Sequence, residues 1–130
     1  MRVMVDMSVT LLHHGHIRIL KKAKKIGSII FVALTSDEEI IKKKGYTPEL
    51  NFSQRKEILL SIKYVDKVVK SPWLIDENFL DKYRIDLLIH GEDNSNKITK
   101  KRLKLFKRTK GISSSELRFR SSKIYNNKLK

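Results

Sequence analysis

The sequence contains no cysteine. This absence excludes a disulfide framework and a thiolate metal centre, and it fits the expected cytoplasmic location. The chain also has no apolar run long enough to span a membrane, and its first residues lack the apolar core of a signal peptide, so no membrane association is expected. No internal repeat or domain boundary interrupts the 130 residues, a length that suits one layered domain.

Acidic residues are scarce: 14 Asp and Glu stand against 29 Lys and Arg, which gives a net charge of +15. Such a charge fits nucleic acid, an anionic membrane surface or phosphorylated small substrates, and a lysine-favouring genome would produce it as well. Aromatic residues are scattered rather than interleaved with the lysines, which argues against a nucleic-acid-binding strand. Charge alone therefore leaves the partner open, and a small basic nucleic-acid-binding protein stays as an alternative.

Apolar runs alternate with helical patterns along the chain. Residues 28–35 are apolar without alternation, as in a central parallel strand that is covered on both faces. The predicted strands are 2–5, 28–35, 65–69 and 85–90, with a short edge strand at 103–106, and predicted helices begin near residues 15, 36, 51, 76 and 111. This alternation predicts an α/β fold with a single doubly wound, Rossmann-like parallel sheet over residues 1–120. Residues 121–130 are expected to be a disordered basic tail.

Two histidines follow the first predicted strand, at the start of a helix whose basic residues 18, 21, 22, 24 and 25 are expected to be solvated. His13 and His16 are three residues apart and lie on one face of the first turn, where free amides and the helix dipole favour an anion. Gly15 leaves room for a phosphate to approach the backbone. His-x-x-His also occurs by chance, and a zinc site would lack ligands, since only His90 remains. In a doubly wound sheet, residues 6–16 and 90–93 should converge on one crevice.

A second candidate anion site lies near the other end of the chain. Gly111 precedes three serines at a predicted helix start, where amides and hydroxyls would bind phosphate together. Arg108 and Arg118 bracket this segment with guanidinium groups that suit phosphate oxygens. The alternative is that the serines only cap a short helix.

These segments resemble the HxGH nucleotidyltransferases, and most closely the glycerol-3-phosphate cytidylyltransferase-like family. His13 to His16 match the HxGH motif, and Arg108 to Arg118 resemble the RTEGIS(S/T)T segment and the ISSTxxR signature. The likeness covers roughly residues 1–118. Further segments resemble the family motifs STDE, HRK, RYVDEV and MGDD, at residues 35–38, 55–56, 64–68 and 90–93.

The resemblance implies transfer of CMP from CTP to a glycerol-3-phosphate-like acceptor, with pyrophosphate released, Mg²⁺ accompanying the triphosphate and no metal site in the protein. The product would be a cell-surface polysaccharide precursor, and a homodimer is a state to test. The implied catalytic residues are His13, His16 and Arg118. The implied nucleotide-binding residues are Met7, Ser8, His13, His16, Asp93, Arg108, Thr109, Gly111, Ile112, Ser113, Ser114 and Ser115. Candidates for the acceptor or its phosphate are Lys42, Lys44, Arg55, Lys63 and Trp73.

Simpler interpretations exist for some of these residues. Lys42 and Lys44 end a helix and could be solvated, Lys63 could lie on a solvated helix, and Trp73 could pack in a turn. An adenylyltransferase of the same fold is the alternative enzyme. The chain also departs from the family pattern, because Met7 to Thr10 replace the usual Gly-x-Phe-Asp, Lys110 replaces a glutamate, and the segment between residues 93 and 108 is short.

Overall fold

The structure is a computed structural model, and it describes residues 1–91 and 95–129. In chain order the elements are β1 (Arg2–Met7), α1 (His14–Ile26), β2 (Ile29–Thr35), α2 (Asp37–Lys44), α3 (Phe52–Leu60), β3 (Lys67–Ser71), α4 (Glu77–Lys82), β4 (Leu87–Gly91), η1 (Lys100–Arg102), β5 (Leu103–Phe106) and α5 (Ser114–Leu129). No helix in the described part of the chain is long and apolar enough to cross a membrane.

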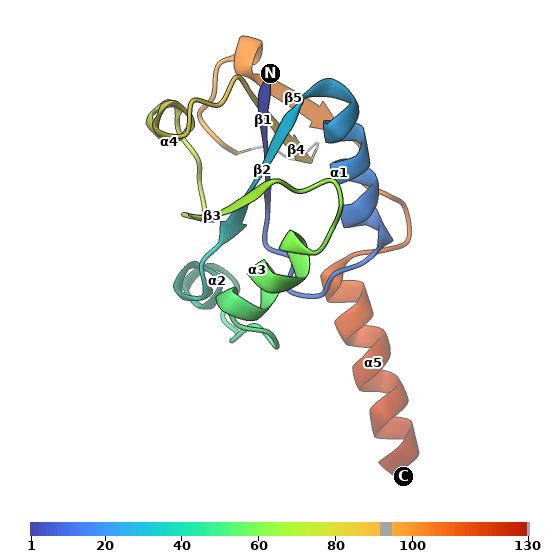
Figure 1. The fold of residues 1–130 in the computed structure, drawn as a ribbon. Helices are drawn as coiled ribbons and strands as arrows, with labels where there is room; N and C mark the ends of the chain where they lie inside the picture. Colours follow the sequence, from blue (N-terminus) through green and yellow to red (C-terminus); the bar gives the residue numbers. More distant parts are fainter. Residues whose placement is uncertain (92–94, 130) are drawn as a thin grey trace.

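The strands form one parallel sheet in the order β3-β2-β1-β4-β5 (Figure 1). β1 is central, since Val3 is paired with Ile30 of β2 on one side and with Leu87 of β4 on the other. The chain runs outward from β1 to β3 and then crosses back to β4, so strand order reverses between β1 and β4. Ligands of such sheets bind beyond the carboxyl ends of the strands at this point. The predicted doubly wound, Rossmann-like sheet is confirmed.

Each face of the sheet has its own core, because successive side chains of a strand point to opposite faces. One core lies under α1 and α3, and the other lies under α4. The first includes Val3, Val5, Leu20 and Leu59, and the second includes Met4, Phe31 and Leu80. Central strands that are covered on both sides need apolar residues at every position, which explains the unbroken apolar run of β2.

Several strand boundaries differ from the sequence prediction: β2 and β4 begin one and two residues later than predicted, and β1 and β3 differ as follows. β1 extends to Met7, two residues beyond its predicted end, because Asp6 and Met7 still pair with β2. β3 begins at Lys67 rather than at residue 65. The Asp66 carboxylate accepts a hydrogen bond from the Ile30 amide at 2.7 Å, so a side chain takes the place of a strand carbonyl there.

The last helix also differs from the prediction. α5 continues through residues 121–129, where the sequence predicts a disordered tail, and it projects away from the sheet (Figure 1). The side chains of residues 119–128 are exposed. Once a helix has formed its first turn, each added residue gains a backbone hydrogen bond, so this extension needs no tertiary contact.

Candidate active site

A cleft of about 570 Å³ opens at the carboxyl ends of β1 and β4. The loop after β1, the first half of α1, the segment after β5 and the first turn of α5 form its walls. It brings together most of the predicted site residues, namely Met7, Ser8, His13, His16, Lys44, Trp73, Arg108, Thr109, Ile112, Ser113, Ser114 and Ser115. Two segments about a hundred residues apart therefore share one cavity.

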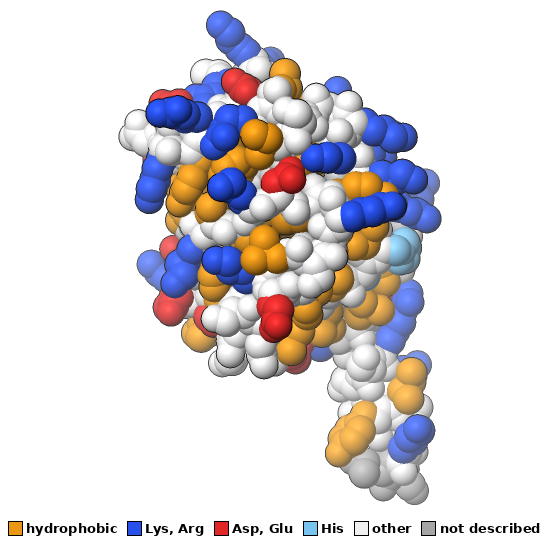
Figure 2. All heavy atoms as spheres, viewed as in Figure 1, with side chains coloured by type: hydrophobic (Ala, Val, Ile, Leu, Met, Phe, Trp, Pro, Cys, Tyr) orange, Lys and Arg blue, Asp and Glu red, His pale blue; other side chains and the backbone are white. Residues whose placement is uncertain are grey.

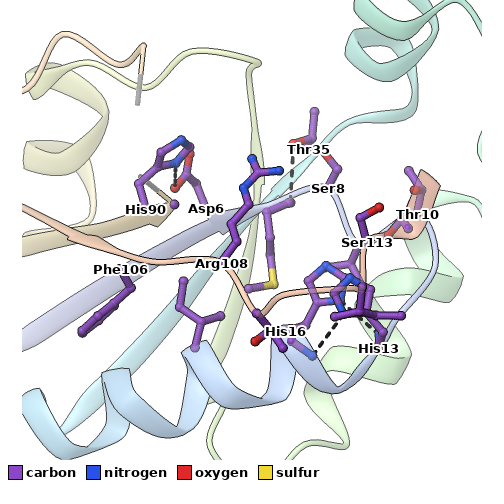
Figure 3. A pocket seen from close by; sticks show the side chains of 18 of the residues that line it. Asp6, Ser8, Thr10, His13, His16, Thr35, His90, Phe106, Arg108 and Ser113 are labelled. Carbon is purple, nitrogen blue, oxygen red and sulfur yellow. Dashed lines mark hydrogen bonds and ion pairs between the residues drawn. The ribbon is translucent and has the colours of Figure 1, made fainter. Parts of the chain in front are cut away.

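The two motif histidines form the amino-terminal cap of α1. His13 is the N-cap residue, and its Nδ1 accepts a hydrogen bond from the Gly15 amide at 3.0 Å. Nδ1 of His16 accepts in turn from the His13 amide at 3.1 Å. The two rings lie beside each other in the cleft, with centroids 3.8 Å apart (Figure 3). This reciprocal arrangement is a capping box built from two imidazoles.

The capping bonds fix the protonation of both rings. A neutral imidazole has one acceptor and one donor nitrogen, so a ring that accepts at Nδ1 carries its proton on Nε2. Burial, and then the neighbouring His14, lower the pKa of His13. Burial, and then His13, lower the pKa of His16 to about 3. Each neutral ring therefore offers one Nε2–H donor, in a cleft that is lined by several Lys and Arg side chains.

Gly15 has a steric role different from the one expected. A Cβ at this position would lie 2.8 Å from Cε1 and 2.9 Å from Nδ1 of His13, and 3.5 Å from the Thr109 Cβ. The space above Gly15 is therefore filled by the His13 ring, whereas the sequence analysis expects a phosphate there. A glycine between the histidines allows the first to fold back over the helix start.

The loop that replaces Gly-x-Phe-Asp has a strained backbone. Val9 is buried and has a φ of 47°, in the left-handed region that β-branched residues rarely adopt. Ser8 is held on both sides: its hydroxyl bonds Thr35 Oγ1 at 3.3 Å, and its carbonyl accepts from Arg55 at 2.7 Å. Thr10 is 1% exposed, and its hydroxyl has no hydrogen-bond partner among the described residues. Strain and an unpaired buried hydroxyl at one loop are typical of a functional site.

The serine-rich segment packs directly on the histidine loop. Ser114 Oγ donates to the Leu11 carbonyl at 2.7 Å and accepts from the Leu11 amide at 3.2 Å. Ser113 caps α5 by accepting from the Glu116 amide at 3.0 Å. Arg120 donates to the Gly111 carbonyl at 3.0 Å and so fixes the turn before the helix. The serines thus do both things considered from the sequence: they cap a helix and they line the cleft.

A carboxylate and a histidine meet at the switch point itself. Asp6 of β1 lies 2.6 Å from Nδ1 of His90 on β4 (Figure 3). The Asn96 amide group donates to the other Asp6 oxygen at 3.3 Å. Asn96 also accepts from the Ile75 amide at 2.7 Å. Asp6 is the one acidic side chain among the described residues that line the cleft.

Several predicted site residues lie elsewhere. Arg55 is 1% exposed, and its guanidinium donates to the carbonyls of residues 8, 35 and 50 and to Asp37. Arg118 is paired with Glu49. The cleft lining does not include Lys42, Lys63, Arg55, Gly111 or Arg118 among the described residues. Asp93 lies outside the residues that the structure describes.

The structure adds residues that the sequence analysis did not select. Arg18 and Lys22 of α1 line the cleft, although they are expected to be solvated. They are spaced four residues apart and follow Gly15 at positions i+3 and i+7, on the side of the helix that faces the cleft, which is the signal that could have identified them. Lys22 also lies 5.2 Å from the centroid of the Phe106 ring of β5. Figure 2 shows basic side chains along the edge of the molecule formed by α1.

Comparison with known proteins adds the family. A model of the family described as cytidylyltransferase-like matches residues 10–120. A glycerol-3-phosphate cytidylyltransferase of Staphylococcus aureus is 35% identical over 124 residues, covering 90% of this chain and 92% of that protein. An ethanolamine-phosphate cytidylyltransferase of Arabidopsis thaliana is 35% identical over 131 residues, covering 89% of this chain and 31% of that protein.

The chain spans about a third of the length of the ethanolamine-phosphate relatives from Arabidopsis thaliana and Dictyostelium discoideum, at 31% and 35%. Among solved structures, a lipopolysaccharide core biosynthesis protein of Thermoplasma volcanium superposes with a TM-score of 0.63 at 22% identity, over 95% of this chain and 87% of that chain. That likeness concerns the fold. The family model and the staphylococcal relative both extend over most of the chain, which therefore belongs to the cytidylyltransferase-like family.

Proposed function

We propose that this protein transfers CMP from CTP to a small phosphorylated acceptor and releases pyrophosphate. The observation that carries the proposal is the convergence of the neutral His13 and His16 donors with Arg108 and the serine-rich start of α5. This arrangement supplies hydrogen-bond donors and positive charge, which suits a reaction that is catalysed by positioning and charge stabilisation.

The chemistry needs no covalent enzyme intermediate. An oxygen of the acceptor phosphate attacks the α-phosphorus in line, a new P–O bond forms, and the bond to the bridging oxygen breaks so that pyrophosphate leaves with the electron pair. The attacking phosphate already carries negative charge, so no general base is required. His13 and His16 would donate from Nε2 to oxygens of the transferring phosphate, and the first turn of α5 would hold the leaving phosphates.

Magnesium is proposed to arrive with the triphosphate, where it would neutralise phosphate charge. The described cleft residues fit this role, because the one carboxylate, Asp6, is already engaged by His90 and Asn96. No group of three His, Asp or Glu that could hold a metal occurs within residues 1–91 and 95–129.

Two acceptors are proposed, and the structure offers an argument for each. Lys44 in the cleft suits the phosphate of a glycerol-3-phosphate-like acceptor, whose product would be a cell-surface polysaccharide precursor. Ethanolamine phosphate is the second candidate, because the Trp73 ring lines the same cleft and an aromatic face attracts an ammonium group. Relatives named for each acceptor are about equally similar to this chain.

The proposal is tested by pyrophosphate release with each nucleotide and each acceptor. CTP with Mg²⁺ should support turnover and protect the protein against heat more than ATP, GTP or UTP at equal concentration. Preferred use of ATP would establish the adenylyltransferase alternative. Release with glycerol-3-phosphate or ethanolamine phosphate identifies the acceptor, and no release with any pair would refute the proposal.

The alternative of a nucleic-acid-binding function is tested by measuring how DNA and RNA binding depends on salt concentration. If the positive surface serves small phosphates, binding of DNA or RNA should be weak, indifferent to sequence and mostly lost at physiological salt. Tight, sequence-dependent binding under those conditions would favour the alternative. A cytoplasmic location and a homodimer are further parts of the proposal, measured by cell fractionation and by sedimentation.

A further inference from the structure

Arg118 forms an ion pair between α5 and the segment that precedes α3. Its Nε lies 3.0 Å and 2.9 Å from the two carboxylate oxygens of Glu49, and its Nη2 lies 2.7 Å from Oε2. The guanidinium carbon also sits 4.4 Å from the centroid of the Tyr46 ring. A planar guanidinium that is both bidentate and stacked has a defined orientation, which a single lysine contact would not give.

The partners of Arg118 lie in the segment between α2 and α3, residues 45–51, which we call the lysine loop because it follows the lysines that end α2. Lys44 precedes this loop, lines the cleft and lies 5.8 Å from the centroid of the Trp73 ring. At its other end, the Leu50 carbonyl accepts from the buried Arg55 at 3.1 Å. The loop therefore joins the acceptor side of the cleft to the interior of the domain.

α5 is attached to the rest of the domain at two points. Ser114 joins its first turn to the histidine loop through Leu11. Arg118, one turn later, joins it to the lysine loop. Within the described residues, every recorded hydrogen bond, ion pair and ring contact between α5 and the lysine loop involves Arg118.

We propose that the Glu49–Arg118 pair is a positioning element, which fixes the lysine loop to α5 and so holds the acceptor in register with the phosphates bound at the start of α5. This inference rests on the proposed function for its kinetic consequences. It assigns Arg118 a role different from the phosphate contact that the sequence analysis expects, since both bonded nitrogens are directed at Glu49. The two side chains are 29% and 42% exposed, so the pair contributes little to global stability.

The experiment measures four variants beside the wild type: Arg118→Ala, Glu49→Ala, the double variant that carries both alanines, and a charge-reversed variant that carries both Glu49→Arg and Arg118→Glu. We expect each single variant to raise the acceptor KM by roughly three- to fivefold and to leave the CTP KM within about twofold, because the bond orients the acceptor side and an exposed ion pair is worth at most about 1 kcal/mol, which is a factor of about five. The double variant should be no worse than either single variant, and the charge reversal should recover part of the loss. Lys24→Ala is the matched control, because its pair with Asp66 has similar exposure, 37% and 40%, and involves neither α5 nor the lysine loop.

Other outcomes would overturn the inference. If Arg118 binds phosphate directly, Arg118→Ala will raise the CTP KM and Glu49→Ala will leave the CTP KM unchanged. The charge-reversed variant will then keep the raised KM of Arg118→Ala. If the pair is only structural, losses will follow the melting temperature and affect both substrates alike.

A binding measurement separates this inference from the proposed reaction. Tripolyphosphate, used as a probe of the α5 start, should slow hydrogen exchange in residues 46–50 of the wild type and not in Arg118→Ala. Should the wild type transfer no CMP, this protection would still support the coupling, whereas unchanged exchange in the wild type would refute it.

Discussion

The capping box of α1 allows the chemical and structural roles of its histidines to be separated. α3 begins with an ordinary box, in which the Asn51 amide donates to Gln54 Oε1 and the Gln54 amide donates to Asn51 Oδ1, each at 2.9 Å. Replacing His16 with Gln copies this arrangement into α1. The side-chain oxygen can accept from the residue 13 amide, as Nδ1 does now, while the imidazole Nε2–H is lost.

The expected magnitudes follow from that difference. Loss of one preorganised donor to the transferring phosphate should reduce kcat by roughly a hundred- to a thousandfold. The retained cap should keep the unfolding free energy within about 0.5 kcal/mol of the wild type, whereas His16→Ala should lose about 1 kcal/mol, or roughly 3–6 °C in melting temperature. Pyrophosphate release and thermal unfolding are measured on the same samples.

His14 provides the control for this experiment. Its side chain is exposed and takes no part in the capping box, so His14→Ala should change neither measurement appreciably. Wild-type turnover in His16→Gln would refute the catalytic role. A loss of activity in His16→Ala alone would show that His16 matters only as a cap.

Three further predictions concern pH and buried polar groups. Because the pKa of His16 is lowered to about 3, the unfolded state binds a proton that the folded state does not, so stability should fall as pH drops from about 6.5 toward 3. Urea unfolding across that range should show the decline in the wild type and a weaker one in His16→Gln. Thr10→Val removes an unpaired buried hydroxyl while keeping the shape of the side chain. Denaturant unfolding should show that the unfolding free energy rises by about 1 kcal/mol, and a decrease would mean that the hydroxyl is hydrogen-bonded. Arg55→Ala should lower the unfolding free energy by about 3–5 kcal/mol in the same measurement, since it leaves the carbonyls of residues 8 and 35 without this donor and removes the ion pair with the half-buried Asp37. A change near zero would contradict the interior role.

The sheet and the cleft could be predicted because their signals are local. Unbroken apolar runs identified the strands, and the Gly and Ser pattern near residue 111 identified the start of α5. The geometry that sequence could not supply is set by side-chain pairing across long separations. Nothing near Arg118 in the sequence points to Glu49, and the two are 69 residues apart.

The same limit explains the other differences. An arginine such as Arg55 is a common phosphate ligand. In the folded chain, however, its guanidinium donates to the backbone carbonyls of Ser8 and Thr35, which are distant from it in the sequence. The sequence predicts a first strand over residues 2–5 that stops before the polar Asp6, yet pairing with β2 continues past Asp6 and places its carboxylate at the switch point. In each case tertiary contacts override the local preference of the residue.

The projecting part of α5 is continuous with the turns that attach this helix to the rest of the domain (Figure 1). Beyond residue 120 the helix rises for about 13 Å, at 1.5 Å per residue, and the side chains of residues 121–128 are exposed. Its inner turns are attached to the histidine loop through Ser114 and to the lysine loop through Arg118. A helix is stiff over this length, so a sideways force on its outer turns would rotate both attachments together. Torque applied far from the substrates would thus reach both sides of the cleft at once.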